Sequence, residues 1–243
     1  MRRPSITLIL LGLLSFSSCT TYQYITLGSP EVAQDASKSL TWENDTMRLT
    51  YNFHGEGGPI SITLANKMDK PLFVNWTKSA LIRDGQAFSL MDRNVQISGA
   101  FAGASVGGRG FRYTGGGFSG SLQLPEGVDL VPPGAHIAKN LNAAAVPSAV
   151  YSDKFMDKTQ AQEKKVVLST GGGYKYKQYS FDQSSSPVQF KSYLTFSLAN
   201  STEEFFVSHS FYAREILLSE EVPDYFTFYQ PDGDKLFVKL HNQ

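Results

Sequence analysis

Apolar and polar residues alternate with a period of two along three stretches in the first third of the chain. The stretches are 47–53, 60–64 and 72–76, and the polar segments HGEGGP and NKMDKP separate them. Successive side chains of a strand point to opposite faces, so this alternation predicts strands with one buried face. We expect the three strands to form a meander. Trp76 is in phase with the apolar residues of its stretch, so we expect its ring in the core.

The same alternation returns in the second half of the chain. It covers 188–198 and 205–216 and predicts two more strands. The segments 224–230 (DYFTFYQ) and 235–241 (KLFVKLH) flank the sequence PDGD, whose Asp-Gly pair suits a tight turn, so they predict a β-hairpin. Only 153–165 (DKFMDKTQAQEKK) has a helix-like composition.

Composition also favours strands over helices. The chain has 17 Phe, 12 Tyr, 2 Trp and 21 Gly, and only 18% of its residues are charged. Aromatic residues are enriched in strands, and glycine destabilises helix interiors. We therefore predict an all-β fold, a two-sheet antiparallel β-sandwich that is immunoglobulin-like or related. It would form a single domain over 38–243 with a glycine-rich loop insertion at 97–121.

The start of the chain has the pattern of a secretory signal peptide. Arg2 and Arg3 precede an apolar run at 6–14. This run is shorter than the roughly 20 residues that a membrane-spanning helix needs. We expect residues 1–18 to be a signal peptide that is removed.

Cys19 is the only cysteine in the chain, and it follows this signal directly. The stretch SFSSC resembles the lipobox of bacterial lipoproteins, although Phe16 stands where leucine is usual. The resemblance implies a diacylglyceryl group on the Cys19 thiol and a membrane anchor. We expect 19–37 to be the lipidated cysteine and a tether. The alternative is an ordinary signal peptide that leaves Cys19 as a free thiol.

Two longer segments carry a second resemblance. Residues 51–82 (YNFHGEGGPISITLANKMDKPLFVNWTKSALI) and 186–198 (SPVQFKSYLTFSL) resemble a family of small, uncharacterised lipoproteins from Bacteroidota-type bacteria. In that family a lipobox precedes a β-rich domain. The resemblance implies a fold and an anchor, and it brings no catalytic residues.

Charge argues against a nucleic-acid partner. The chain has 22 basic and 22 acidic residues, so loss of the two arginines of the signal leaves a small acidic excess. A nucleic-acid or anionic-lipid surface is normally met by a basic excess, which is absent from this composition.

The glycine-rich segment contains two motif matches that lack their structural context. GASVG at 103–107 fits the nucleophile elbow of hydrolases, and GGGFSG at 115–120 fits a dinucleotide-binding turn. Both motifs require a helix directly afterwards, and neither site is followed by a helix-forming stretch. We interpret the segment as a flexible loop or as glycine-bent edge strands.

Acid–base and metal chemistry have one weak candidate. The four histidines are widely separated, and no second cysteine is present to complete a zinc site. His54 and Glu56 share a face at strand spacing, and an envelope hydrolase with a site assembled from His54, Glu56 and Ser105 is the alternative function. A polar turn explains the pair more simply. No catalytic residue, metal or cofactor is expected.

The preferred function is a non-enzymatic binding module on the membrane of a bacterial envelope. Its partners would be the lipid bilayer, through acylated Cys19, and an envelope protein or glycan. Two aromatic segments would supply the contact surface through Phe111, Arg112, Tyr113, Tyr174, Tyr176 and Tyr179. The alternative for these residues is simple packing. Residue 20 is Thr and no acidic run follows Cys19, so we expect the outer membrane, facing the periplasm.

Overall fold

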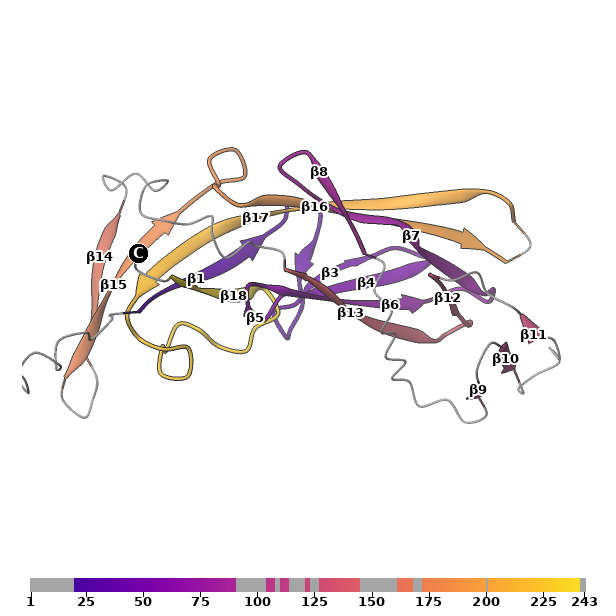
Figure 1. Ribbon diagram of the computed structural model, residues 1–243, viewed down its shortest axis with the longest axis horizontal. Coiled ribbons are helices and arrows are strands. Elements are labelled where there is room, and N and C mark those ends of the chain that lie inside the picture. The colour runs from indigo at the N-terminus through magenta and orange to yellow at the C-terminus, as the bar shows by residue number, and fades with distance from the viewer. Residues whose placement is uncertain are drawn as a thin grey trace, which may run out of the picture.

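A computed structural model describes residues 20–90, 127–144, 161–167, 172–199 and 201–240, and three short strands between 104 and 122. Every regular element in these residues is a β-strand. The strands form two large sheets that pack face to face and a third small sheet (Figure 1). The predicted all-β fold with two packed sheets is confirmed.

The larger sheet has ten strands. Seven follow one another in the order β12 (Val128–Val131), β7 (Leu72–Arg83), β16 (Gln189–Leu198), β17 (Glu204–Ser219), β1 (Thr21–Gly28), β18 (Lys235–Leu240) and β5 (Gly55–Glu56). The other three are β8 (Gln86–Ser89), which pairs with β7, β15 (Gly173–Ser180), which pairs with β17, and β14 (Gln162–Val167), which pairs with β15. The prediction of antiparallel sheets holds for each pair except β18–β5, which is parallel.

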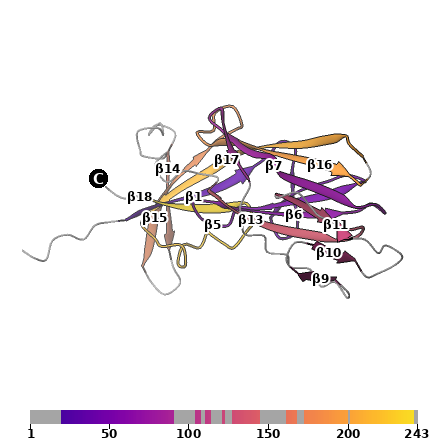
Figure 2. The ribbon, with the colours of Figure 1, turned by 45° about the vertical axis from the view of Figure 1, so that its right-hand side comes forward.

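The second sheet has five strands and covers only part of the first. Its order is β13 (His136–Ala144), β6 (Pro59–Asn66), β4 (Met47–Asn52), β3 (Leu40–Glu43) and β2 (Ala33–Gln34). Figures 1 and 2 show β14 and β15 extending past this sheet at one end of the molecule. The large sheet therefore has a covered part and an uncovered part.

The core between the sheets follows the alternation of the sequence. β4 and β6 bury every second residue, and the burial pattern of β6 is exposed or intermediate at the positions between. Trp76 on β7 is 1% exposed, so the prediction that its ring lies in the core is confirmed. The Trp76 indole donates to Asp129 Oδ2 at 2.6 Å, and the Lys139 ammonium lies 4.8 Å from the ring centroid.

Strand β17 lies in the middle of the large sheet and pairs with β16, β1 and β15. Its first half pairs with β16, and its second half pairs with β1 on one side and β15 on the other. The predicted strands at 188–198 and 205–216 correspond to β16 and β17, so these predictions are confirmed.

The predicted tether at 19–37 is wrong for residues 21–28. These residues form β1, a central strand that pairs with both β17 and β18. Five consecutive residues of β1 are buried, including Gln23 and Thr26, so the strand shows no alternation. The described domain therefore begins at Thr21 and not at residue 38.

The predicted meander is wrong in its third strand. β6 pairs with β4 and β13, whereas the next strand, β7, belongs to the other sheet and pairs with β16. The chain crosses between the sheets after Asn66, whose side-chain amide donates to the backbone carbonyls of Lys70 and Val131. These bonds fix the crossing.

The predicted hairpin at 224–241 is also wrong. Residues 235–240 form β18, but its partners are β1 and β5, and 224–230 contains no strand. Gly233 packs against Ser39, and its carbonyl accepts from the Phe53 amide at 2.7 Å. This contact holds the PDGD segment against the second sheet rather than in a turn between paired strands.

Two segments fall partly outside the described residues. In the segment 153–165, whose composition is helix-like, residues from 162 onward belong to strand β14, and 153–160 lie outside the described part. In the glycine-rich segment 97–121, the described residues form β9 (Ala104–Gly107), β10 (Gly110–Tyr113) and the start of β11 (Ser121–Leu122). These three strands make the separate small sheet with β10 at its centre, whereas a flexible loop or a pair of edge strands was expected.

Candidate functional site

The six residues predicted as one contact surface lie at two ends of the molecule. Phe111, Arg112 and Tyr113 are on β10, while the three tyrosines are on β15. Figures 1 and 2 place β10 and β15 at opposite ends. A single surface made of all six residues is therefore wrong. The side chains of β10 lie outside the described part of the chain.

The three tyrosines of β15 are largely buried. Tyr179 is 2% exposed and belongs to the core between the sheets. Tyr174 and Tyr176 are 9% and 8% exposed and belong to a second cluster with Tyr24, Leu217 and Phe226. Packing, the simpler alternative, thus describes all three side chains.

This second cluster covers the outer face of the large sheet where the second sheet does not reach. Phe226 comes from the β17–β18 connection and stacks on Tyr24 with ring centroids 4.2 Å apart. Tyr174 and Tyr176 pack beside it at 5.5 and 5.9 Å. Burial, together with neighbouring phenols and Glu221, raises the pKa of Tyr24, whose hydroxyl donates to the Glu221 carbonyl. The segment 224–230, which is a loop, thus buries the ring of Phe226, whereas Tyr225 and Phe228 are exposed.

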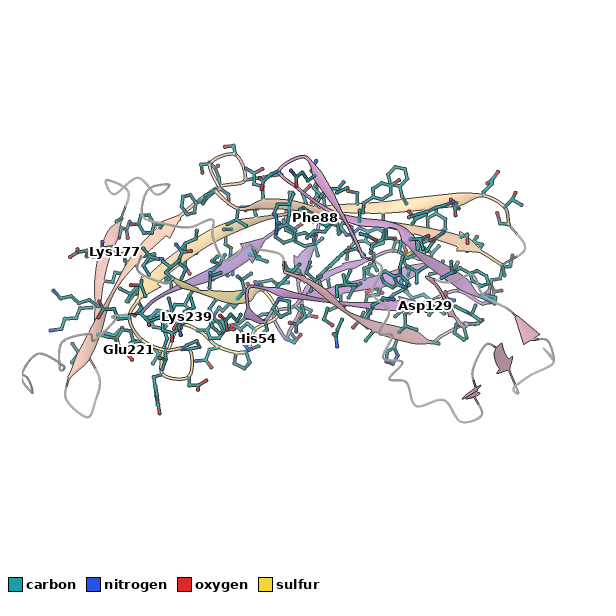
Figure 3. The ribbon with its side chains drawn as sticks, in the orientation of Figure 1. His54, Phe88, Asp129, Lys177, Glu221 and Lys239 are labelled. Atoms are coloured by element: carbon teal, nitrogen blue, oxygen red, sulfur yellow. The ribbon has the colours of Figure 1, made fainter. Side chains whose placement is uncertain are left out.

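A polar pocket lies at the same end. It has a volume of about 580 Å³. Its lining brings together the start of β1, both strands of the β14–β15 hairpin and the end of β17, and includes Thr21, Glu163, Lys175, Lys177, Glu220 and Glu221. Figure 3 shows Lys177 and Glu221 near this end, whereas Asp129 lies toward the other. We call this region, residues 162–167, 173–177 and 218–228 with Thr21, the anchor end, because Thr21 follows the expected anchor residue, Cys19, by two positions.

A second surface lies at the far end of β17. Phe206 is 61% exposed and stacks on Tyr193 of β16, with ring centroids 4.9 Å apart. Both rings line a groove of about 270 Å³ together with Lys78 and Glu204. Lys78 Nζ lies 2.6 Å from Glu204 Oε2, and this bond lowers the pKa of Glu204. We call these four residues the far face.

Sequence reasoning missed the far face although a signal was present. Phe206 and Tyr193 occupy the outward-facing phase of strands whose other phase is apolar and buried. An aromatic residue in the polar phase has no core to enter. Such residues are candidates for contact with a partner.

The residues of the alternative hydrolase are not shown to meet. The His54 ring stacks on Tyr229 with centroids 5.0 Å apart, and Glu56 is exposed. Ser105 is on β9 of the small sheet, which Figure 1 shows far from β5, and its side chain lies outside the described part. The described residues therefore give no geometry for a nucleophile and base.

One described serine does lie near a histidine, but deep in the core. The Tyr51 hydroxyl is 3.0 Å from Ser192 Oγ and 2.9 Å from His209 Nδ1, and all three residues are at most 3% exposed. Burial lowers the pKa of His209 and raises that of Tyr51. The adjoining cavity is only about 10 Å³, which has no room for a substrate. This network joins the two sheets.

Metal binding has no candidate in the ranges given above, where no three His, Cys, Asp or Glu side chains are grouped to hold an ion. Among those same residues no helix is long and apolar enough to cross a membrane. Comparison of the chain with protein families, with curated proteins and with solved structures found no match.

Proposed function

We propose that the chain is a lipid-anchored protein of a bacterial envelope that acts by binding a partner rather than by catalysis. The observation that carries this proposal is the exposed far face, since Phe206 stands free of the core while the Ser–His pair of the core is sealed from solvent. In the far face, the exposed ring of Phe206 lies at the same groove as a cation, Lys78, and an anion, Glu204. Such a set recognises a protein segment or a glycan.

The anchor in this proposal is acylated Cys19. A secretory pattern precedes this cysteine, and strand β1 begins two positions after it. Each buried methylene contributes roughly 0.8 kcal/mol, so two or more acyl chains hold a protein durably on a bilayer. The outer membrane, with the domain in the periplasm, is the proposed location.

The far face would lie well away from this anchor. From Phe206 to Ser219, the last residue of β17, the strand extends roughly 40 Å at about 3.3 Å per residue. Ser219 is paired with Tyr22, close to Cys19 in the chain. A partner at the far face would thus be met clear of the head groups.

Replacement of Cys19 by serine tests the anchor. The variant should lose its acyl chains by mass spectrometry and move from the membrane fraction to the soluble envelope fraction. Sedimentation of Cys19→Ser with membranes after a high-salt wash would contradict the anchor.

Affinity capture from envelopes tests the binding. Phe206→Ala should capture at least about tenfold less partner than the wild type, whereas the matched control Val222→Ala, also a change of an exposed apolar residue, should capture as much as the wild type. Protease treatment of the envelope before capture removes a protein partner, and periodate oxidation removes a glycan. Equal capture by the wild type and Phe206→Ala would contradict a role for the far face.

A further inference from the structure

The anchor end carries most of the exposed large apolar residues. Among the described residues, five large apolar side chains are exposed, and four of them lie there: Val167 (73%), Val222 (38%), Tyr225 (74%) and Phe228 (41%). Val167 ends strand β14, and the other three belong to the β17–β18 connection. Phe228 packs on Tyr176 with ring centroids 5.0 Å apart, so the connection and the hairpin meet.

The β14–β15 hairpin also concentrates positive charge in a chain of zero formal net charge. Its described residues include Lys164, Lys165, Lys175 and Lys177 against Glu163 alone, a net charge of about +3. Three more acidic side chains of this end, Glu220, Glu221 and Asp224, belong to the β17–β18 connection, and Glu220 and Glu221 line the same pocket as Lys175 and Lys177. The hairpin is thus the basic part of the anchor end.

The chain connects this end directly to Cys19. Thr21 lines the same pocket as Lys175 and Lys177. Cys19 precedes Thr21 by two residues, which span at most about 7 Å when fully extended. Because β1 is a central strand, no long tether separates an acyl group on Cys19 from the hairpin.

From these observations we propose that the anchor end lies on the surface of the bilayer that holds Cys19. The hairpin lysines contact the phosphates of anionic phospholipids, and Val167, Tyr225 and Phe228 enter the head-group region. This inference rests on the proposed lipid anchor. Aromatic and aliphatic side chains beside lysines are typical of surfaces that lie in the membrane interface. The contact fixes the orientation of the domain and directs the far face away from the membrane.

Tryptophan quenching tests this orientation in the full protein as the cell processes it. The protein is reconstituted in vesicles of phosphatidylethanolamine and phosphatidylglycerol whose acyl chains are brominated. Val167→Trp is compared with Phe206→Trp, an exposed position at the far face, after subtraction of the emission of Trp42 and Trp76 in the wild type. Quenching should be at least about threefold stronger for Val167→Trp. Equal quenching at both positions would overturn the orientation.

The lysines are tested with a matched pair of variants. K164Q/K165Q/K175Q/K177Q should reduce the quenching of Val167→Trp in anionic vesicles, while K38Q/K67Q/K70Q/K191Q, a change of four exposed lysines elsewhere, should not. Vesicles of phosphatidylcholine alone should quench Val167→Trp less than anionic vesicles. If neither the hairpin quadruple variant nor the removal of anionic lipid changes the quenching of Val167→Trp, the proposed contact with phosphates is overturned.

Failure of the anchor is distinguished from failure of this inference. If mass spectrometry finds no acyl chain on Cys19, the proposed anchor fails, and the same soluble protein is mixed with anionic vesicles. Affinity that falls about a hundredfold in the hairpin quadruple variant would still support the lipid contact. No vesicle binding at all by that protein would overturn it.

Discussion

The two ends of strand β17 differ in how they are buried, since the far end buries only the inner face of the sheet and the anchor end buries both faces. At the far end the inner face packs against the second sheet, and the outer face leaves Phe206 exposed. At the anchor end the second sheet is absent, and Phe226 from the β17–β18 connection covers the outer face instead. There Leu218 closes the inner core, and its direct partner Lys177 lines the pocket.

This difference shows how a sheet longer than its partner is stabilised. A strand that extends beyond the second sheet must bury its apolar side chains elsewhere. The connection 220–234 supplies that cover with a cluster of stacked rings, whose pairwise contacts add roughly 0.5–1.5 kcal/mol beyond area burial. The ends of the molecule should therefore respond differently to substitution.

Trp76→Ala should have the largest effect because it opens the core shared by both sheets. We expect a loss of about 3–5 kcal/mol from the free energy of unfolding. The substitution also removes the indole that donates to Asp129 and the ring beneath buried Lys139. Chemical denaturation measures the loss, with Trp76→Phe as a control that keeps an aromatic ring. A loss below about 1 kcal/mol would contradict the core role.

Phe226→Ala should uncover the anchor end and spare the sandwich. We expect a loss of about 3 kcal/mol, since the ring is 1% exposed and lies in the smaller cluster. Hydrogen exchange should become faster in β15 while β4 and β6 keep their protection. Uniform loss of protection in both sheets would show that the two clusters form one cooperative core.

Tyr51→Phe should weaken the connection between the sheets without a change of volume. Ser192 and His209 would then lose a buried hydrogen-bond partner, which costs about 1–3 kcal/mol. Thermal unfolding measures the shift. Unchanged stability would mean that both groups find other partners after the substitution.

Acidification should produce the smallest effect, through His209. Burial lowers the pKa of His209 in the folded state, although Glu31 opposes the shift, so the unfolded chain takes up its proton first as the pH falls. The contribution of His209 to stability should therefore be full above the ordinary histidine pKa of about 6.5 and decline as the pH falls below it. Most carboxylates with a lowered pKa, such as Glu43 with a pKa of about 2, change the stability only in more acidic solution. His209→Gln should flatten the decline, and an unchanged slope would contradict this assignment.

The sequence by itself determined the strands that have one polar and one apolar face. The alternation of β4, β6, β16 and β17 and the burial of Trp76 follow from the period of two, which is a local property of the chain. The far face was also readable, since Phe206 and Tyr193 stand in the outward phase.

Only the tertiary structure decided which strands pair and which segments cover them. β1 is buried on both faces and therefore shows no alternation, and Gln23 and Thr26 interrupt the apolar run that would otherwise mark a buried strand. Its place between β17 and β18 depends on residues far away in the chain. The segment 224–230 is rich in aromatic residues but forms a loop, because the outer face of β1, β15 and β17 offers burial to Phe226 without strand pairing. Alternation reports that one face is buried, and it carries no information about what buries it.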